Sequence, residues 1–221
     1  LPTDNSVTKE DVVRREVFAS FPVFNYFDDL IDEFQTKGYQ ENTDLFVFPY
    51  DWRLPIETNS ELLKQKINDV LAQTNAGKVD LVAHSMGGLV AKRVLFDHPE
   101  LSEKVDTIIF LGTPHLGAPK TAKALLFGED FDIPLLSQSK MKEISRNMTS
   151  VYQLLPGRSY GPYVTDLGSS LNYDATRSFF LTNGSLNGSL ITASDNFHSS
   201  AFDSFTPQGP AIYSIAGCKQ P

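Results

Sequence analysis

Along the first 116 residues, segments with helical spacing of apolar residues alternate with short runs of consecutive apolar residues. Apolar positions spaced three and four apart predict helices at about residues 24–34, 60–73 and 86–96. Runs of consecutive apolar residues predict strands buried on both faces at 45–48, 79–83 and 105–111. A capping pattern also predicts a short helix over about 8–18. This alternation indicates an α/β fold, with a mostly parallel sheet flanked by helices and joined by right-handed crossovers.

The pattern changes after residue 116. The following stretch is richer in Ser, Asn, Gly and Phe, its helical segments are short, and its small tandem echo NGSLNGSL is typical of turns. A strand pattern returns at 211–217. We therefore expect residues 1–116 and 210–221 to form the core, with residues 117–209 inserted as a cap, called the cap segment below.

The stretch VDLVAHSMGGLVAKRVL, residues 79–95, joins a predicted strand to a predicted helix. It contains small-x-Ser-x-Gly, from Ala83 to Gly87, at the strand-to-helix turn where a nucleophile elbow is found. Such a tight turn forces Ser85 into strained backbone angles, brings residues 83 and 87 close together and favours small side chains there. It also presents the N–H of Met86, at the start of the helix, to a developing oxyanion. The alternative is an ordinary Ser-Gly turn without chemistry.

Composition narrows the classes of function. With 221 residues and 41% hydrophobic content, the chain suits one globular domain with an insertion. The net charge is −8 and no stripe of Lys and Arg occurs, so no nucleic-acid partner is expected. No apolar run approaches the length of a membrane span, and a single cysteine excludes an internal disulfide. The sequence has no phosphate-binding loop, no paired CxxC and no HxxxH, so neither a cofactor nor a metal is predicted.

Three motifs together resemble one family. FPYDWRL (48–54), LVAHSMGGLVAKRVL (81–95) and FLGTPHLGAPK (110–120) occur in the order and spacing of lecithin:cholesterol acyltransferase-like proteins of the α/β-hydrolase fold, and SVYQLLP (150–156) is similar to their cap region. The resemblance implies acyl-ester chemistry on lipids, through an acyl-enzyme that passes its acyl group to water or to an alcohol. It also implies that Ser85 is the nucleophile and that the Met86 N–H is one oxyanion donor.

The sequence departs from this family at both ends. In this fold the triad runs Ser, acid, His along the chain. The resemblance places the acid and the His after the strand at 211–217, where only four residues follow. The N-terminal stretch shows no Gly-rich loop for a second oxyanion donor. We therefore expect a hydrolase core without its triad acid and base, whose unpaired sheet edges favour self-association. A non-catalytic binding or scaffold domain is the alternative.

Other candidates are weaker. His198 is a possible base, although its place in the cap segment favours a surface helix or loop, and the candidate acids are Asp174, Asp195 and Asp203. His84 and His115 are expected to line a substrate pocket or to brace loops beside it. Asp51 and Arg53 are more typical of a structural ion pair beside Trp52. Apolar residues of the cap segment form either a small core or a surface for acyl chains.

Overall fold

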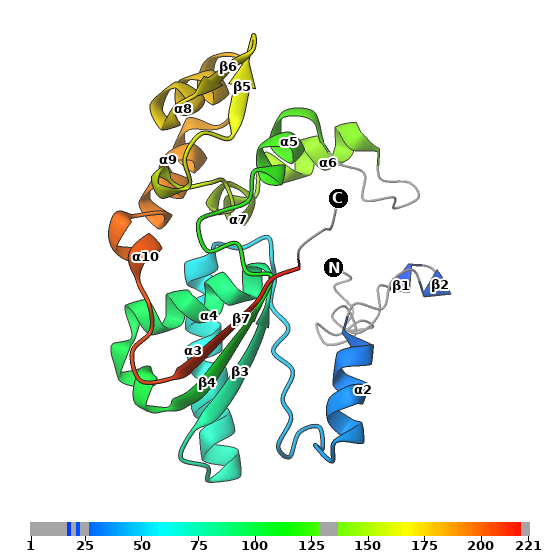
Figure 1. Cartoon of the computed structure of the whole chain (residues 1–221). Coiled ribbons are helices and arrows are strands. Elements are labelled where there is room, and N and C mark those ends of the chain that lie inside the picture. Colours follow the sequence, from blue (N-terminus) through cyan, green and yellow to red (C-terminus); the bar gives the residue numbers. More distant parts are fainter. Residues whose placement is uncertain (1–16, 19–20, 23–26, 129–136, 218–221) are drawn as a thin grey trace.

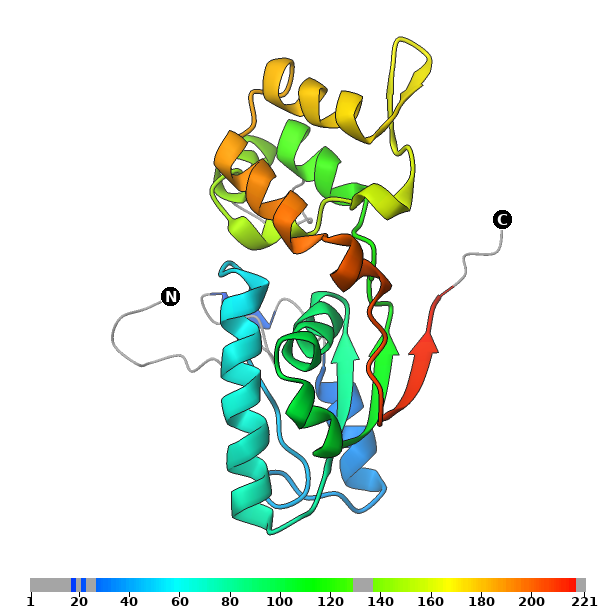
Figure 2. The ribbon, with the colours of Figure 1, turned by 90° about the vertical axis from the view of Figure 1, so that its left-hand side faces the viewer.

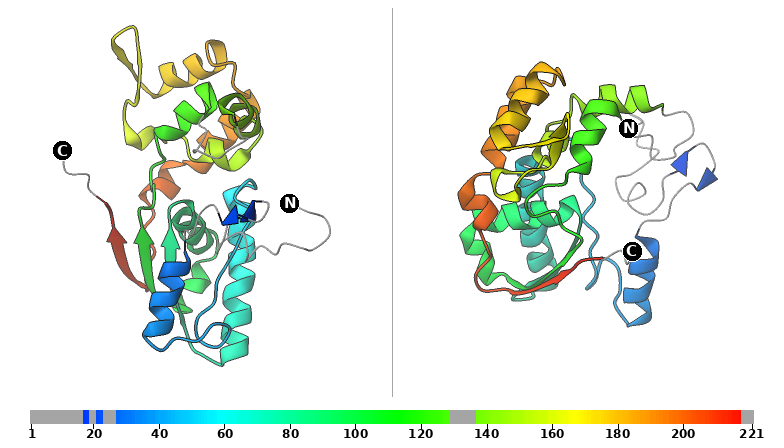
Figure 3. Two further views of the ribbon diagram at one scale, coloured as in Figure 1. Left: turned by 90° about the vertical axis from the view of Figure 1, so that its right-hand side faces the viewer. Right: turned by 45° about the horizontal axis from the view of Figure 1, so that its top comes forward.

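The computed structural model describes residues 17–18, 21–22, 27–128 and 137–217. Its centre is a three-stranded parallel sheet in the order β3 (Val79–His84), β4 (Val105–Leu111) and β7 (Ala211–Ile215). Helix α4 (Met86–Asp97) covers one face with α3 (Ile56–Thr74) packed beside it, and α2 (Asp28–Thr36) lies on the opposite face (Figures 1 and 3). This arrangement confirms the predicted α/β class with a parallel sheet flanked by helices.

Most predicted core elements are present, with shifted ends. The strand at 105–111 has the predicted bounds, and those at 79–83 and 211–217 are β3 and β7. Helix α3 begins after Pro55, earlier than expected, and ends at Thr74, because the left-handed backbone of Asn75 (φ 54°) stops it before Gly77. The helix expected over 8–18 lies mostly outside the described residues. At its end Val17–Phe18 is instead strand β1, paired with β2 (Phe21–Pro22).

The strand predicted at 45–48 is wrong. Leu45 makes only an isolated bridge with Glu41, and residues 46–50 belong to no strand. The apolar run has a different cause. Phe48 and Tyr50 pack against the core as individual side chains, and their rings stack at a centroid distance of 5.9 Å. Consecutive apolar residues here indicate that side chains are packed against the core, and they do not indicate a strand with a ladder of backbone hydrogen bonds.

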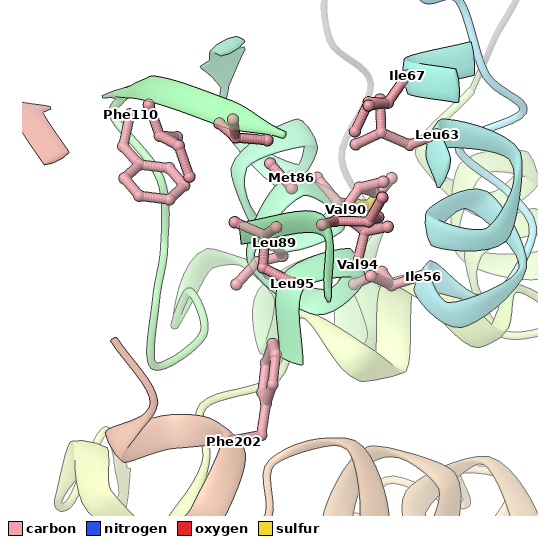
Figure 4. Close-up of a cluster of buried hydrophobic side chains, with 14 of the residues drawn as sticks. Ile56, Leu63, Ile67, Met86, Leu89, Val90, Val94, Leu95, Phe110 and Phe202 are labelled. Atoms are coloured by element: carbon pink, nitrogen blue, oxygen red, sulfur yellow. The ribbon is translucent and has the colours of Figure 1, made fainter. Parts of the chain in front are cut away.

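The core lies between the sheet and the two helices beside it. Leu89, Val94 and Leu95 of α4 are fully buried, as are Val105 and Ile108 of β4. Figure 4 shows side chains of α3 and α4 meeting in this cluster. Helix α4 is apolar around most of its circumference because it is covered both by the sheet and by α3.

The cap segment forms a helical layer above the carboxyl ends of the strands (Figure 2). Its elements are α5 (Lys120–Phe127), α6 (Gln138–Ser145), α7 (Thr149–Gln153), the short helix η2 (Arg158–Tyr160), the hairpin β5 (Val164–Asp166) and β6 (Ser169–Leu171), α8 (Tyr173–Thr182), α9 (Gly188–Phe197) and α10 (Ser200–Ser204). A second apolar cluster, centred on Tyr152, Leu155 and Phe180, holds it together. Phe197 and Phe202 belong instead to the core cluster. The end of the cap segment is therefore built into the core.

In the part of the chain that the structure describes, no helix is both long and apolar enough to cross a bilayer.

Candidate active site

Ser85 occupies the turn between β3 and α4. Its backbone has φ 52° and ψ −126°, a combination that costs a residue with a side chain about 1–3 kcal/mol. The turn is held on both sides. The Ser85 N–H donates to the carbonyl of Leu111 at 2.9 Å, and the Ser85 carbonyl accepts from the Gly88 N–H at 3.0 Å. The strained conformation predicted for this residue is therefore present.

The close approach at the turn occurs at a different glycine from the one expected. A Cβ atom at Gly87 would meet only the ring of Tyr50, at an ordinary 3.5 Å from the hydroxyl. A Cβ atom at Gly88 would lie 1.9 Å from Oγ1 of Thr113. The expected contact between residues 83 and 87 is thus replaced by contact of α4 with the loop that follows β4, because the helix passes directly over that loop.

Met86 is the first residue of α4. Its N–H has no partner one turn earlier in the helix, and the helix dipole adds partial positive charge at this end. Its side chain is buried in the core cluster, so the backbone at this position is held in place. The geometry fits an anion-stabilising donor beside Ser85.

Tyr50 is a neighbour of the turn that sequence reasoning missed. Its ring packs against the core cluster and lies next to Gly87. Burial raises its pKa to about 12, so the hydroxyl remains neutral beside Ser85 at physiological pH. The motif FPYDWRL contained this residue, but only the fold brings it to the turn.

The loop after β4 forms the other side of the site. Gly117 has φ 94°, and a Cβ atom there would lie 2.5 Å from Cα of Pro156. The loop is also bonded to the end of α7, through Ala118 N–H to the Leu154 carbonyl at 2.8 Å and Gly157 N–H to the Leu116 carbonyl at 2.9 Å. The motifs at 110–120 and 150–156 are therefore packed against each other.

The two predicted pocket histidines differ in their surroundings. His115 is half-buried, with its ring edge-on to Phe110 at 4.8 Å between centroids. Burial, with a smaller contribution from the Lys92 cation, lowers the pKa of His115, so its neutral form is favoured. His84 is exposed and packs edge-on against Phe27 at 5.5 Å, on the side of the sheet that faces α2. Substrate contact by either residue stays a prediction.

The expectation that His198 lies on a surface helix or loop is wrong. Its side chain is 0% exposed. Nδ1 lies 2.7 Å from Oδ1 of Asp203, and Nε2 lies 2.9 Å from the Gln153 carbonyl oxygen. Both ring nitrogens are thus occupied by partners other than Ser85. The residue is buried because α9 and α10 end against the core.

The candidate acids all have other partners. Asp203 is paired with His198, as above. Asp174 is exposed and pairs with Arg158 at 2.7 Å, and Asp195 accepts from Arg177 Nε at 2.8 Å and from the Tyr173 hydroxyl. None of these interactions involves Ser85.

Asp51 and Arg53 form the expected ion pair. Arg53 donates to both carboxylate oxygens of Asp51, at 2.8 and 2.6 Å. Arg53 is half-exposed, and Trp52 is exposed rather than packed beside the pair. The Asp51 carbonyl accepts from the buried Asn59 side chain, which fixes the loop to α3.

Among the described residues, no group of His, Cys, Asp and Glu has an arrangement that would hold a metal ion.

Comparison with known proteins places the chain in a family. The family model described as lecithin:cholesterol acyltransferase matches residues 18–206. The lysosomal phospholipase A and acyltransferase of Rattus norvegicus is 31% identical over 138 residues, which are 61% of this chain and 33% of that protein. The phosphatidylcholine-sterol acyltransferase of Mus musculus is 31% identical over 156 residues, 68% of this chain and 35% of that protein.

The chain spans about a third of the length of the curated relatives it matches. Among solved structures, a chain of the Tle4–Tli4 complex superimposes with a TM-score of 0.51 at 14% identity, covering 93% of this chain and 54% of that chain. This likeness concerns the fold alone.

Proposed function

The chain belongs to the lecithin:cholesterol acyltransferase family, and we propose that it carries the nucleophile of a serine acyl hydrolase or acyltransferase that acts on lipid esters. Ser85 is the nucleophile in this proposal, and the Met86 N–H is one oxyanion donor. Named relatives are phospholipases and acyltransferases, which supports an ester of a lipid as the substrate.

One observation carries the proposal. A Ser with a strained backbone stands at the carboxyl end of the parallel strand β3 and at the start of helix α4. A residue in such a conformation persists only where surrounding structure enforces it, and here the Leu111 carbonyl and the Gly88 N–H do so. An ordinary connecting turn does not require this strain.

The chemistry follows from the turn. Oγ of Ser85 forms a bond to the ester carbonyl carbon while a base removes its proton. The carbonyl oxygen becomes an oxyanion, which the Met86 N–H and the helix dipole stabilise. The bond to the alcohol then breaks, the alcohol leaves with a proton, and an acyl-enzyme remains. Water or a second alcohol takes the acyl group and restores Ser85.

The cap segment and the histidines complete the proposal. Residues 117–209 serve as a cap, because they lie over the carboxyl edge of the sheet with an apolar cluster of their own. His115, in the loop beside the turn, and His84 contribute to the walls of the substrate pocket. His198 and Asp203 are not assigned as base and acid, since both ring nitrogens of His198 are occupied by other partners.

Labelling with a fluorophosphonate probe tests this proposal. The probe reacts with activated serines, and peptide mass mapping identifies the labelled residue. Ser85→Ala should abolish labelling, whereas Ser159→Ala, which removes a serine of the cap segment, should leave it unchanged. The same experiment on the complete gene product separates the activity of this chain from that of a longer protein.

Labelling at Ser85 in either protein supports the proposal. Labelling of the complete product alone places the base outside this chain, and labelling of this chain places it inside. Absence of labelling in both proteins would overturn the proposal and favour a hydrolase-like domain that binds a ligand or partner without chemistry.

A further inference from the structure

Buried polar groups link the nucleophile helix to the cap segment. Lys92 of α4 is 3% exposed, and its ammonium donates to the Asp203 carbonyl of α10 at 3.1 Å. The Asp203 carboxylate is bonded to Nδ1 of His198 at 2.7 Å. Nε2 of His198 is bonded in turn to the Gln153 carbonyl, at the end of α7. These bonds connect α4, α10, α9 and α7 in one continuous chain.

Gln153 extends this chain to a second core helix. Its side-chain oxygen accepts from the Ile56 N–H, the first of α3, at 2.8 Å. Its side-chain nitrogen donates to Glu57 at 2.6 Å. The chain from Lys92 to Ile56 thus fixes the cap segment to both α4 and α3. We call the three residues at its centre, Gln153, His198 and Asp203, the clasp.

The clasp geometry requires one proton more than a neutral imidazole and an ionised carboxylate carry together. The Gln153 carbonyl only accepts, so Nε2 of His198 must carry hydrogen. The contact of Nδ1 with Asp203 then needs a second hydrogen between them, whether it is held by the ring or by the carboxyl group. Without that proton, the lone pair of Nδ1 would face the carboxylate at 2.7 Å.

The surroundings of His198 have charges of both signs. The ring follows the C-terminal end of α9, where the helix dipole favours a cation. A hollow of about 370 Å³ beside it is also lined by Arg158, Tyr173 and Asp195. The other charged groups packed nearby are Lys92 and Arg93 of α4, Arg177 of α8, which contacts Asp195, and Glu57 beyond Gln153.

The Asp203 carboxylate is buried and only partly hydrogen-bonded. Its side chain is 2% exposed, and within the described part of the chain Oδ2 has no hydrogen-bond partner. The absence of a side chain at Gly157 gives this oxygen its space, since a Cβ atom there would lie 2.6 Å from it. A buried pair with an unsatisfied oxygen gains little net stability, so it serves better to specify one arrangement than to stabilise the fold.

We propose that the His198–Asp203 pair is a proton-dependent clasp that holds the cap segment on α4 and α3. The clasped state binds one proton that the open state releases, so low pH favours the clasped state and rising pH opens it. With one linked proton, opening increases about tenfold per pH unit above the point of release. The proposal concerns the position of the cap segment, and it does not depend on whether Ser85 is a nucleophile.

Two nuclear magnetic resonance measurements test the clasp in the whole chain. The first follows the ring nitrogens of His198 in protein carrying ¹⁵N-histidine, from about pH 5 to about pH 9. The second follows hydrogen exchange of the Ile56 amide, corrected for its intrinsic rate. We expect both ring nitrogens of His198 to be engaged with hydrogen at low pH, and Ile56 protection to fall about tenfold per pH unit once the proton is lost.

Asp203→Asn is the decisive variant. Its amide can donate to Nδ1 of a neutral His198, so all clasp bonds form without the additional proton. Ile56 protection should then be independent of pH. His98→Asn, which removes a histidine bonded to α3 outside the clasp, should behave like the wild type.

The wild-type chain alone can overturn the proposal. It fails if Ile56 protection is unchanged across the pH range, or if the His198 ring at low pH lacks hydrogen on Nε2. It also fails if Asp203→Asn folds and retains the wild-type pH dependence. Because none of these readouts is catalytic, failure of the clasp is distinguishable from failure of the proposed function.

Discussion

A Cβ atom at Gly88 would lie 1.9 Å from Oγ1 of Thr113. Helix α4 can therefore cross the loop after β4 at this distance only because residue 88 has no side chain. The two residues come from the motifs at 81–95 and 110–120, so the contact gives a physical reason for both. The same glycine also bonds to the nearby turn, since the Gly88 N–H donates to the Ser85 carbonyl.

Gly88→Ala should destabilise the chain although alanine is the better helix former. Overpacking of this kind costs about 1–3 kcal/mol, which exceeds the gain of about 1 kcal/mol in helix propensity. Gly87→Ala is the matched control, because its Cβ meets only Tyr50 at 3.5 Å. Urea unfolding should give a lower free energy for the variant at 88 and an equal or higher one for the variant at 87. Equal effects at both positions would contradict this explanation.

A double variant assigns the effect to Thr113. Thr113→Gly removes the atoms that the new methyl group would strike, so Gly88→Ala should cost less in that background. The coupling free energy between the two positions should be about 1 kcal/mol or more, as for other residues in direct contact. Additive effects in urea unfolding would show that the crowding at Gly88 has another source.

Strain at Ser85 predicts an unusual order of stability. Ser85→Gly relieves a backbone strain of about 1–3 kcal/mol, and the added freedom of glycine in the unfolded chain offsets about 0.5–1 kcal/mol of it. Ser85→Ala keeps the Cβ atom and hence the strain. We expect the glycine variant to be about 1 kcal/mol more stable than the alanine variant in thermal or urea unfolding. The opposite order would mean that the turn is relaxed.

The sequence was sufficient for the strained turn at Ser85 and for the main strands, because these features depend on local patterns. Runs of consecutive apolar residues predicted β3 and β4, and small-x-Ser-x-Gly between a strand and a helix placed the turn at Ser85. The expected burial on both faces is wrong for β3, in which half-buried and exposed residues alternate. The strand predicted at 45–48 was wrong because an apolar run records burial, and burial there comes from single side chains such as Phe48. The spacing of apolar residues alone does not distinguish a buried strand from a loop whose side chains pack singly against the core.

The hydrogen bonds of the clasp could not be predicted from the sequence, for a different reason. Gln153 and His198 are 45 positions apart, and only Gln153 belongs to a motif, SVYQLLP at 150–156. His198 was expected on a surface because of its place in the cap segment, whereas the fold buries it against the core. Local composition does not reveal a long-range polar contact, which tertiary packing alone creates.

Buried tyrosines predict loss of stability in alkali. Burial raises the pKa of Tyr50 to about 12, above its ordinary value of about 10. The group therefore contributes stability that is fully present below about pH 10 and is lost as the pH rises through about 12. Tyr163 and Tyr173 add to the effect in the same direction. Tyr50→Phe should reduce the number of phenols that ionise late by one, measured by ultraviolet absorbance. Equal numbers in both proteins would contradict the burial of Tyr50.

The outer edge of the sheet predicts self-association of the chain. Every residue of β7 is exposed, and in the described sheet this strand pairs only with β4. An open edge that presents Tyr213 and Ile215, which are 57% and 59% exposed, can pair with a second copy. Sedimentation velocity and light scattering should show oligomers that grow with concentration. Replacing both residues by lysine should weaken association by about tenfold or more, because charge on an edge opposes pairing. The substitution Glu33→Lys on α2, away from this edge, changes the net charge by the same amount and would show whether added positive charge alone has that effect. A monomer at high concentration would exclude association through β7.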